Sequence, residues 1–166
     1  MSSNSNEVAY ERPPQDWVAK LFAQLEGPLV AYVRPRVGGD VEQAQDVVQE
    51  SFVKLCQQRW PQIEENATAW LYKTCRNRAI DIIRREGRMG AVSSSMDVST
   101  ITDPTERGPE TRTEQLEEID RMKLQIQDLP DRQQEILRLR LHDGLSYKQI
   151  AEVTGLTATN VGYLLH

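Results

Sequence analysis

The sequence predicts an all-α protein with two small helical domains joined by a flexible linker. Apolar residues recur at helical spacing near both ends of the chain, and no segment alternates apolar and polar residues as a half-buried strand does. Between the two ends, residues 89–112 are rich in Ser, Thr, Gly and Pro and have too little apolar surface to form a core. The chain has 166 residues, 39% of them hydrophobic, which is enough for two small domains.

Three helices are expected before the linker, over residues 16–34, 41–58 and 67–87, after a disordered segment at residues 1–15. Gly27 and Pro28 predict a kink or a break in the first helix, because proline removes a helical hydrogen bond. The apolar positions of the second helix are Ala44, Val48, Phe52, Leu55 and Cys56, and those of the third are Tyr72, Cys75, Ala79, Ile82 and Ile83. Neither cysteine has a histidine or a second cysteine at metal-ligand spacing, so we expect two buried thiols and no metal site.

The second helix has an acidic face opposite its apolar side. Asp46, Gln49 and Glu50 lie there around a single apolar residue, Val53. An acidic face of this kind can dock a basic partner helix, or it can simply keep the protein in solution. The residues alone favour the second interpretation, because most acidic helix faces only keep a protein in solution.

The third helix has a basic face, here called the basic arc. It comprises Trp70, Lys73, Asn77, Asp81, Arg84 and Arg88, with Arg78 and Arg85 beside them. Cations of such an arc follow the phosphates of single-stranded or melting DNA, and an aromatic ring can stack an unpaired base for about 1–3 kcal/mol. The alternatives are a face that is merely charged and solvated, and a Trp70 that packs in the core.

After the linker, helices are expected over residues 113–127 and 131–142, followed by a helix-turn-helix. Ser146 and Gln149 form a capping box, Gly155 ends the first helix of the pair, and Thr157 can cap the second. The second helix of such a pair enters the major groove, which here directs Ala158, Thr159, Asn160 and Tyr163 toward base edges. A small helical hairpin with a purely structural turn is the alternative.

The charge is divided between segments, although its sum is −5. Six basic and two acidic residues lie between Trp70 and Gly90, whereas nine acidic and four basic residues lie between Ala91 and Pro130. The low total therefore does not exclude nucleic-acid binding.

Several classes of protein are not expected. No apolar run approaches the roughly 20 residues of a membrane span, and the N-terminal residues do not resemble a signal peptide, so we expect a cytoplasmic protein without membrane insertion. His142 and His166 have no nucleophile or metal ligand arranged around them, and the chain has no Gly-rich phosphate loop. We expect no catalytic residue, no enzyme activity, no metal and no cofactor.

Three segments together resemble one known family. They read DVVQESF at 46–52, AWLYKTCRNRAIDIIRR at 69–85 and LPDRQQEILRLRLHDGLSYKQIAEVTGL at 129–156. In this order, with a linker before the third, they resemble the regions of extracytoplasmic-function sigma factors. The resemblance covers nearly the whole chain after about residue 16.

The resemblance implies a region 2 helical bundle over residues 16–88 that binds core RNA polymerase and opens the promoter at its minus-ten element. It implies a region 4 helix-turn-helix over residues 113–166 that reads the minus-thirty-five element of the promoter DNA. Carried over by position, the polymerase contact falls on Asp46, Gln49, Glu50 and Val53, and the minus-ten contact falls on the basic arc. The minus-thirty-five contact falls on Lys148, Thr157, Ala158, Thr159, Asn160 and Tyr163. An anti-sigma factor is implied as a further partner.

The recognition helix departs from the family pattern. Gly162, Tyr163 and Leu164 stand where the family commonly has basic residues, and Gly162 costs about 1 kcal/mol of helix stability relative to alanine. Family members also run on for one or two dozen residues after the position of His166, so the sequence predicts either a region 4 truncated at its C-terminal end or a weakened one.

Two other functions remain possible at this point. The chain can be a stand-alone helix-turn-helix regulator, with residues 16–88 as a dimerisation or sensor domain that never contacts polymerase. It can also be an interaction protein that keeps the sigma fold without binding DNA. If it is a sigma factor, the acidic linker and the start of region 4 are expected to weaken DNA binding until polymerase is engaged.

Overall fold

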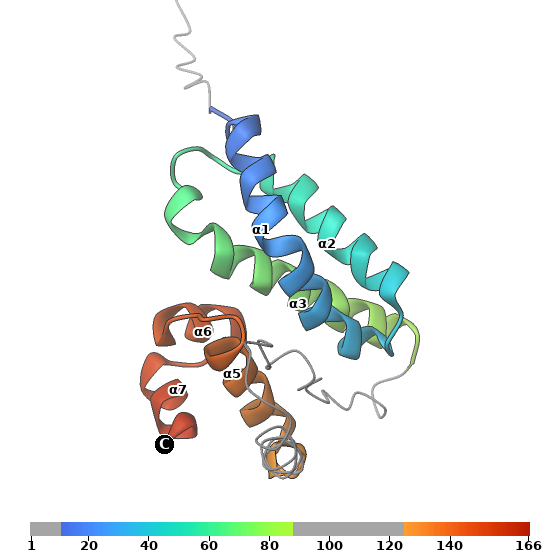
Figure 1. The fold of residues 1–166 in the computed structure, drawn as a ribbon, viewed down its shortest axis with the longest axis vertical. Coiled ribbons are helices and arrows are strands. Elements are labelled where there is room, and N and C mark those ends of the chain that lie inside the picture. The colour runs from blue at the N-terminus through green and yellow to red at the C-terminus, as the bar shows by residue number, and fades with distance from the viewer. Residues whose placement is uncertain (1–10, 88–124) are drawn as a thin grey trace, which may run out of the picture.

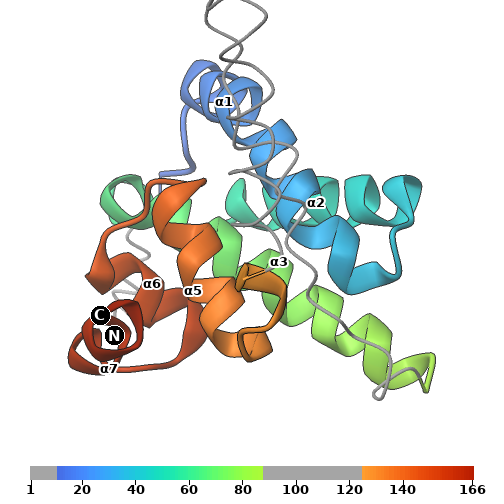
Figure 2. The same cartoon turned by 60° about the horizontal axis from the view of Figure 1, so that its bottom comes forward.

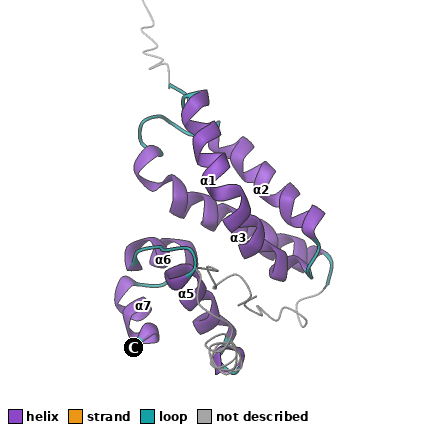
Figure 3. Ribbon diagram, viewed as in Figure 1, coloured by secondary structure: helices purple, strands orange, loops and turns teal. Residues whose placement is uncertain are grey.

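The computed structural model describes residues 11–87 and 125–166, which consist of helices, turns and loops without a strand (Figure 3). The predicted all-α fold is confirmed for these residues. The expected linker at 89–112 and most of the expected helix at 113–127 lie outside them, although residues 125–127 are helical.

The N-terminal helices are α1 (Gln15–Val33), α2 (Val41–Leu55) and α3 (Ala67–Arg85), with short 3₁₀ helices η1 (Arg34–Val37) and η2 (Glu64–Asn66) between them (Figure 1). The three long helices pack on one another and bury Leu29, Val33, Val48, Leu55 and Leu71. The break expected at Gly27 and Pro28 does not occur, because α1 continues through Pro28. Burial of Leu29, Tyr32 and Val33 holds the last turn in place despite the missing hydrogen bond.

Two other expectations about these helices are wrong. Residues 11–15, which were predicted to be disordered, have a defined structure. The backbone N–H of Trp60 donates to the Glu11 carbonyl at 2.9 Å. Cys56 is exposed, whereas Cys75 is buried as expected. The reason is that α2 ends at Leu55, three residues before the predicted end, and Cys56 belongs to the turn that follows.

The C-terminal helices are α5 (Asp131–Leu141), α6 (Tyr147–Thr154) and α7 (Ala158–Leu165). The Gln149 N–H donates to Ser146 Oγ at 3.2 Å, and the Ser146 N–H donates to Gln149 Oε1 at 2.9 Å, which completes the predicted capping box. Gly155 has a φ of 74°, as the turn requires. Thr157 then caps α7 by accepting the Asn160 N–H at 3.2 Å. The helix-turn-helix is confirmed.

The two sets of helices lie against each other. Helix α6 packs on α3, and Figures 1 and 2 show the C-terminal helices along one side of α3. Buried side chains from both sets, among them Tyr72, Cys75, Ile136 and Ile150, form one continuous apolar cluster. The sequence did not predict this contact between the sets.

Candidate functional site

The acidic face of α2 is at the surface. Asp40 caps the helix by accepting the Gln43 N–H at 3.0 Å, and Ala44, Val47, Val48, Phe52 and Leu55 point into the core. The opposite side therefore exposes Asp46, Gln49, Glu50 and Val53, with Val53 59% exposed. These four residues are therefore accessible to another protein.

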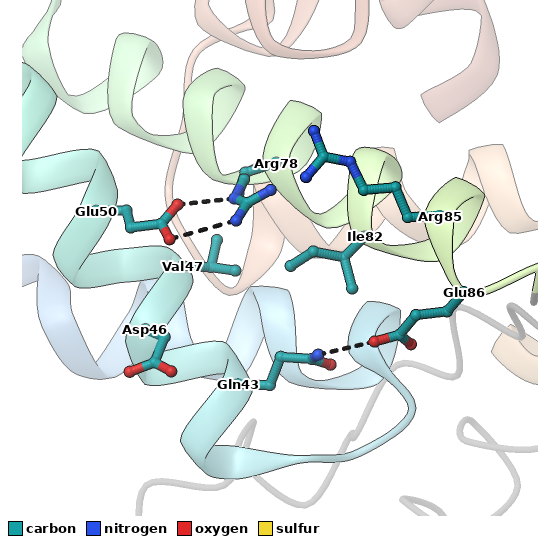
Figure 4. Close-up of a pocket in the computed structure, with 8 residues that line it drawn as sticks. All are labelled: Gln43, Asp46, Val47, Glu50, Arg78, Ile82, Arg85 and Glu86. Atoms are coloured by element: carbon teal, nitrogen blue, oxygen red, sulfur yellow. Dashed lines mark hydrogen bonds and ion pairs between the residues drawn. The ribbon is translucent and has the colours of Figure 1, made fainter.

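The acidic face and the basic arc are joined by one ion pair. Arg78 Nε donates to Glu50 Oε2 at 2.7 Å, and Arg78 Nη2 donates to Glu50 Oε1 at 3.3 Å (Figure 4). The hydrogen bonds from Arg78 lower the pKa of Glu50, and those to Glu50 raise the pKa of Arg78. Sequence reasoning assigned the two residues to different surfaces and missed this pairing, because they lie 28 positions apart on separate helices.

A groove of about 220 Å³ lies between α2 and α3 beside this ion pair. Gln43 Nε2 donates to Glu86 Oε1 at 3.1 Å at its other end, and Figure 4 shows Arg78 and Arg85 on the same side of α3. The groove contains residues predicted to contact polymerase, such as Asp46, and residues predicted to contact DNA, such as Arg85.

The basic arc is accessible along α3. Lys73, Asn77, Asp81, Arg84 and Arg85 are exposed, Arg78 is half-buried, and Arg88 lies outside the described residues. The opposite side of the helix is anchored by Leu71, Tyr72, Cys75, Ala79 and Ile83. The expected core position Ile82 is only half-buried and lines the groove beside Arg78.

Trp70 lies at the edge of the core. It is half-buried against the core and also lines a second groove, of about 320 Å³, with Gln57, Gln58, Arg59, Gln62 and Ile63. Glutamine amides both donate and accept hydrogen bonds, and an indole face stacks planar groups. The groove thus has the chemistry to hold an unpaired base. The amide-rich run QQRWPQ at 57–62 is the signal of this groove in the sequence.

The exposed side of the helix-turn-helix carries the residues predicted to read duplex DNA. Ala158, Thr159 and Asn160 are exposed in the first turn of α7, and Tyr163 is 83% exposed one turn later. Lys148 and Thr157 are exposed beside them, although the Thr157 hydroxyl also caps the helix. Val161 is buried beneath.

Comparisons with known proteins show which family the chain resembles over both sets of helices. Residues 21–89 match the family model for sigma-70 region 2, and residues 119–166 match the model for sigma-70 region 4. The chain belongs to the extracytoplasmic-function sigma factors. Similar proteins include two from Bacillus subtilis (strain 168). RNA polymerase sigma factor YlaC is 26% identical over 92% of this chain and 87% of its own length. RNA polymerase sigma factor SigZ is 28% identical over 84% of this chain and 76% of its own length.

The sigma factor has a further polar cluster where its two sets of helices meet. Glu135 of α5 accepts four hydrogen bonds from the N-terminal helices. Its Oε1 atom accepts three of them, from Tyr32 Oη at 2.6 Å, Arg36 Nη2 at 2.9 Å and Arg76 Nε at 2.9 Å. Its Oε2 atom accepts the fourth, from Arg76 Nη2 at 3.3 Å. Burial alone would raise the pKa of Glu135, but the two arginines and the tyrosine outweigh it and lower the pKa. Sequence reasoning missed this cluster, because its members lie 59 to 103 positions from Glu135 along the chain.

A second contact lies beside the first. Burial raises the pKa of Tyr72, and the nearby Asp143 carboxylate raises it further. Burial also lowers the pKa of Arg138, whose Nε lies 3.9 Å from Asp143 Oδ2. Charged and phenolic groups thus meet between α3 and the C-terminal helices.

Two negative findings apply to residues 11–87 and 125–166. No helix in these ranges is long and apolar enough to cross a membrane. The same ranges contain no group of three or more acidic, His or Cys side chains placed to hold a metal ion.

Proposed function

We propose that residues 16–88 are region 2, which binds core RNA polymerase through α2 and holds the opened minus-ten element along α3. Residues 113–166 are region 4, which reads the minus-thirty-five element through α7. The observation that carries this proposal is the accessibility of all three surfaces, within the segments that match the sigma-70 models. The protein acts in transcription initiation as a sigma factor.

The polymerase contact is assigned to Asp46, Gln49, Glu50 and Val53. Three of them offer carboxylate or amide groups to a basic partner helix, and the exposed Val53 supplies an apolar centre. Glu50 has a second role, because it holds Arg78 in the free protein.

The minus-ten contact is assigned to the basic arc with the groove beside Trp70. The arginines and Lys73 follow the phosphates of the melted strand, and Asn77 contacts a base edge. Bases that leave the duplex stack on protein surfaces such as the Trp70 ring, which offsets the cost of unstacking them. Sigma factors are generally not enzymes, so the binding energy opens the promoter and the polymerase performs the chemistry.

The minus-thirty-five contact is assigned to the exposed face of α7 and to Lys148. Thr159, Asn160 and Tyr163 offer hydroxyl and amide groups to base edges in the major groove, and Lys148 and Thr157 contact phosphates. We also propose an anti-sigma factor as a regulatory partner, by analogy with the family, and the cytoplasm as the site of action, because polymerase and promoter are found there.

Run-off transcription tests the proposal. Core polymerase is supplied with the full chain and a library of promoter sequences, and transcripts are expected only from templates with one pair of minus-ten and minus-thirty-five elements. The paired substitution Asp46→Arg with Glu50→Arg should abolish co-purification with core polymerase, whereas Glu26→Arg on α1 serves as the matched control. Promoter binding by the isolated chain, without any binding to polymerase, would instead support the stand-alone regulator.

A further inference from the structure

We propose that Tyr32, Arg36 and Arg76 form a phosphate site on region 2, which binds a backbone phosphate of the opened promoter and is filled by Glu135 of region 4 in the closed protein. This inference rests on the proposed function, because it needs region 2 to hold promoter DNA. It adds a DNA contact outside the basic arc and the groove beside Trp70.

The donors converge as they would on a phosphate. One carboxylate receives a hydroxyl at 2.6 Å and three guanidinium N–H groups at 2.9 to 3.3 Å. Arg76 contributes two of these groups, Nε and Nη2, one to each oxygen. Arginine binds carboxylates and phosphates with the same planar fork, so Glu135 occupies the position that a phosphate group would take.

Region 2 builds this site from its own residues. Arg36 Nη1 donates to the Tyr32 carbonyl at 2.6 Å, and the Arg36 guanidinium lies 3.9 Å from the centre of the Tyr32 ring. The Tyr32 ring meets the Tyr72 ring edge-on at 5.1 Å, which fixes its orientation. These contacts join residues of region 2, and they hold Tyr32 and Arg36 when Glu135 leaves. Two neighbouring guanidinium groups that face solvent then favour the binding of another anion.

The site lies beside the proposed path of the DNA strand. Arg76 is adjacent to Asn77 in sequence and one helical turn from Lys73, both of which are exposed members of the basic arc. A strand that follows the arc therefore passes the edge of α3 from which Arg76 projects. Arg76 also has the more accessible side chain of the two arginines, 23% exposed against 9% for Arg36.

The closed arrangement cannot contact both promoter elements. Their positions differ by about 25 base pairs, or about 85 Å of duplex. In the structure, α6 packs directly on α3, which at 19 residues is about 28 Å long. Regions 2 and 4 must separate to bind both elements. Separation withdraws Glu135 and vacates the site in the state that holds the promoter.

The first experiment measures the salt dependence of DNA binding by the holoenzyme. Core polymerase with the full chain binds a forked promoter DNA whose minus-ten segment is single-stranded. Arg76→Gln should reduce the slope of log affinity against log salt by roughly 0.7, the value for one phosphate on a single strand. Arg76→Lys, which keeps the charge, should restore the slope, and Lys20→Gln on the exposed side of α1 is the matched control. An unchanged slope for Arg76→Gln would overturn the proposal.

The second experiment tests whether Glu135 fills the site in the free chain. Energy transfer is measured between dyes on Cys56, which is exposed, and on a cysteine replacing His166. Glu135→Gln should lengthen the distance between the dyes and raise the affinity of the free chain for a single strand of the minus-ten sequence about tenfold. Asp128→Asn, which removes an exposed carboxylate near the start of α5, should change neither.

The outcomes separate this inference from the proposed function. If the wild-type chain supports run-off transcription but Arg76→Gln leaves the salt slope unchanged, the phosphate site is wrong and the sigma function stands. If Glu135→Gln opens the chain without any gain in single-strand affinity, the contact only fastens the two regions and the proposal fails. If the wild-type holoenzyme does not transcribe, the proposed function itself fails. If the Glu135→Gln variant does not fold, the slopes of log affinity against log salt for the Arg76 variants still test whether Arg76 binds a phosphate.

Discussion

The ion pair between Glu50 and Arg78 is expected to contribute little to stability. Its shortest contact is 2.7 Å and two hydrogen bonds join the groups, but the Glu50 and Arg78 side chains are 47% and 26% exposed. Solvent screens a pair of this exposure, so its coupling free energy should be about 0.5–1 kcal/mol, near the upper end for surface pairs because it is bidentate. A basic surface of polymerase can therefore replace Arg78 as the partner of Glu50 at a small cost in free energy.

A double-mutant cycle measures this coupling. Chemical denaturation is followed for the wild type, Glu50→Gln, Arg78→Gln and the double variant, and the coupling is the non-additive part of the free energy of unfolding. The pKa of Glu50 is lowered by Arg78, so the contribution is fully present above the ordinary carboxyl pKa and is lost as the pH falls through the lowered value. The coupling should thus be equal at about pH 6 and about pH 8. A coupling above about 2 kcal/mol, or one that changes between these two pH values, would refute the reasoning.

Three other predictions follow from single side chains. Gly162→Ala should raise the free energy of unfolding by up to about 1 kcal/mol, because alanine favours the helix more than glycine does. The new Cβ would lie 3.6 Å from the Tyr147 ring, which is an ordinary contact. A denaturant titration measures the change, and a loss of stability would show that the ring cannot accommodate the methyl group. Alkylation of the native protein should modify Cys56 and spare Cys75, because Cys75 is buried and burial raises the pKa of its thiol to about 11. Mass spectrometry of the peptides measures the labelling, and equal labelling of the two cysteines would contradict the prediction. Trp70→Ala should weaken holoenzyme binding to forked DNA by about 1–3 kcal/mol and leave duplex binding at the minus-thirty-five element unchanged, whereas equal losses on both DNAs would point to general unfolding.

The helices and their exposed faces were largely predictable from the sequence. Helical spacing placed Asp46, Glu50 and Lys73 on the surface and Phe52 and Cys75 in the core, because a helix of known period has only one way to bury its apolar side. The capping box at Ser146 and the glycine at 155 predicted the turn of the helix-turn-helix, because these are local hydrogen bonds and backbone angles. Errors came at helix ends, as at Cys56, where α2 stops three residues before its predicted end.

Sequence and structure therefore decided different features of this sigma factor. The sequence by itself determined the all-α class, the helix-turn-helix and the exposed faces of α2, α3 and α7, since each depends on the periodicity of a single helix or on a local turn. Only the tertiary structure decided that Arg78 is held by Glu50, that Trp70 lines a groove of glutamines, and that Glu135 lies among Tyr32, Arg36 and Arg76. The Glu50–Arg78 and Glu135 contacts join residues 28 to 103 positions apart in the chain, and no local pattern of charge or hydrophobicity specifies which partner a given side chain will meet.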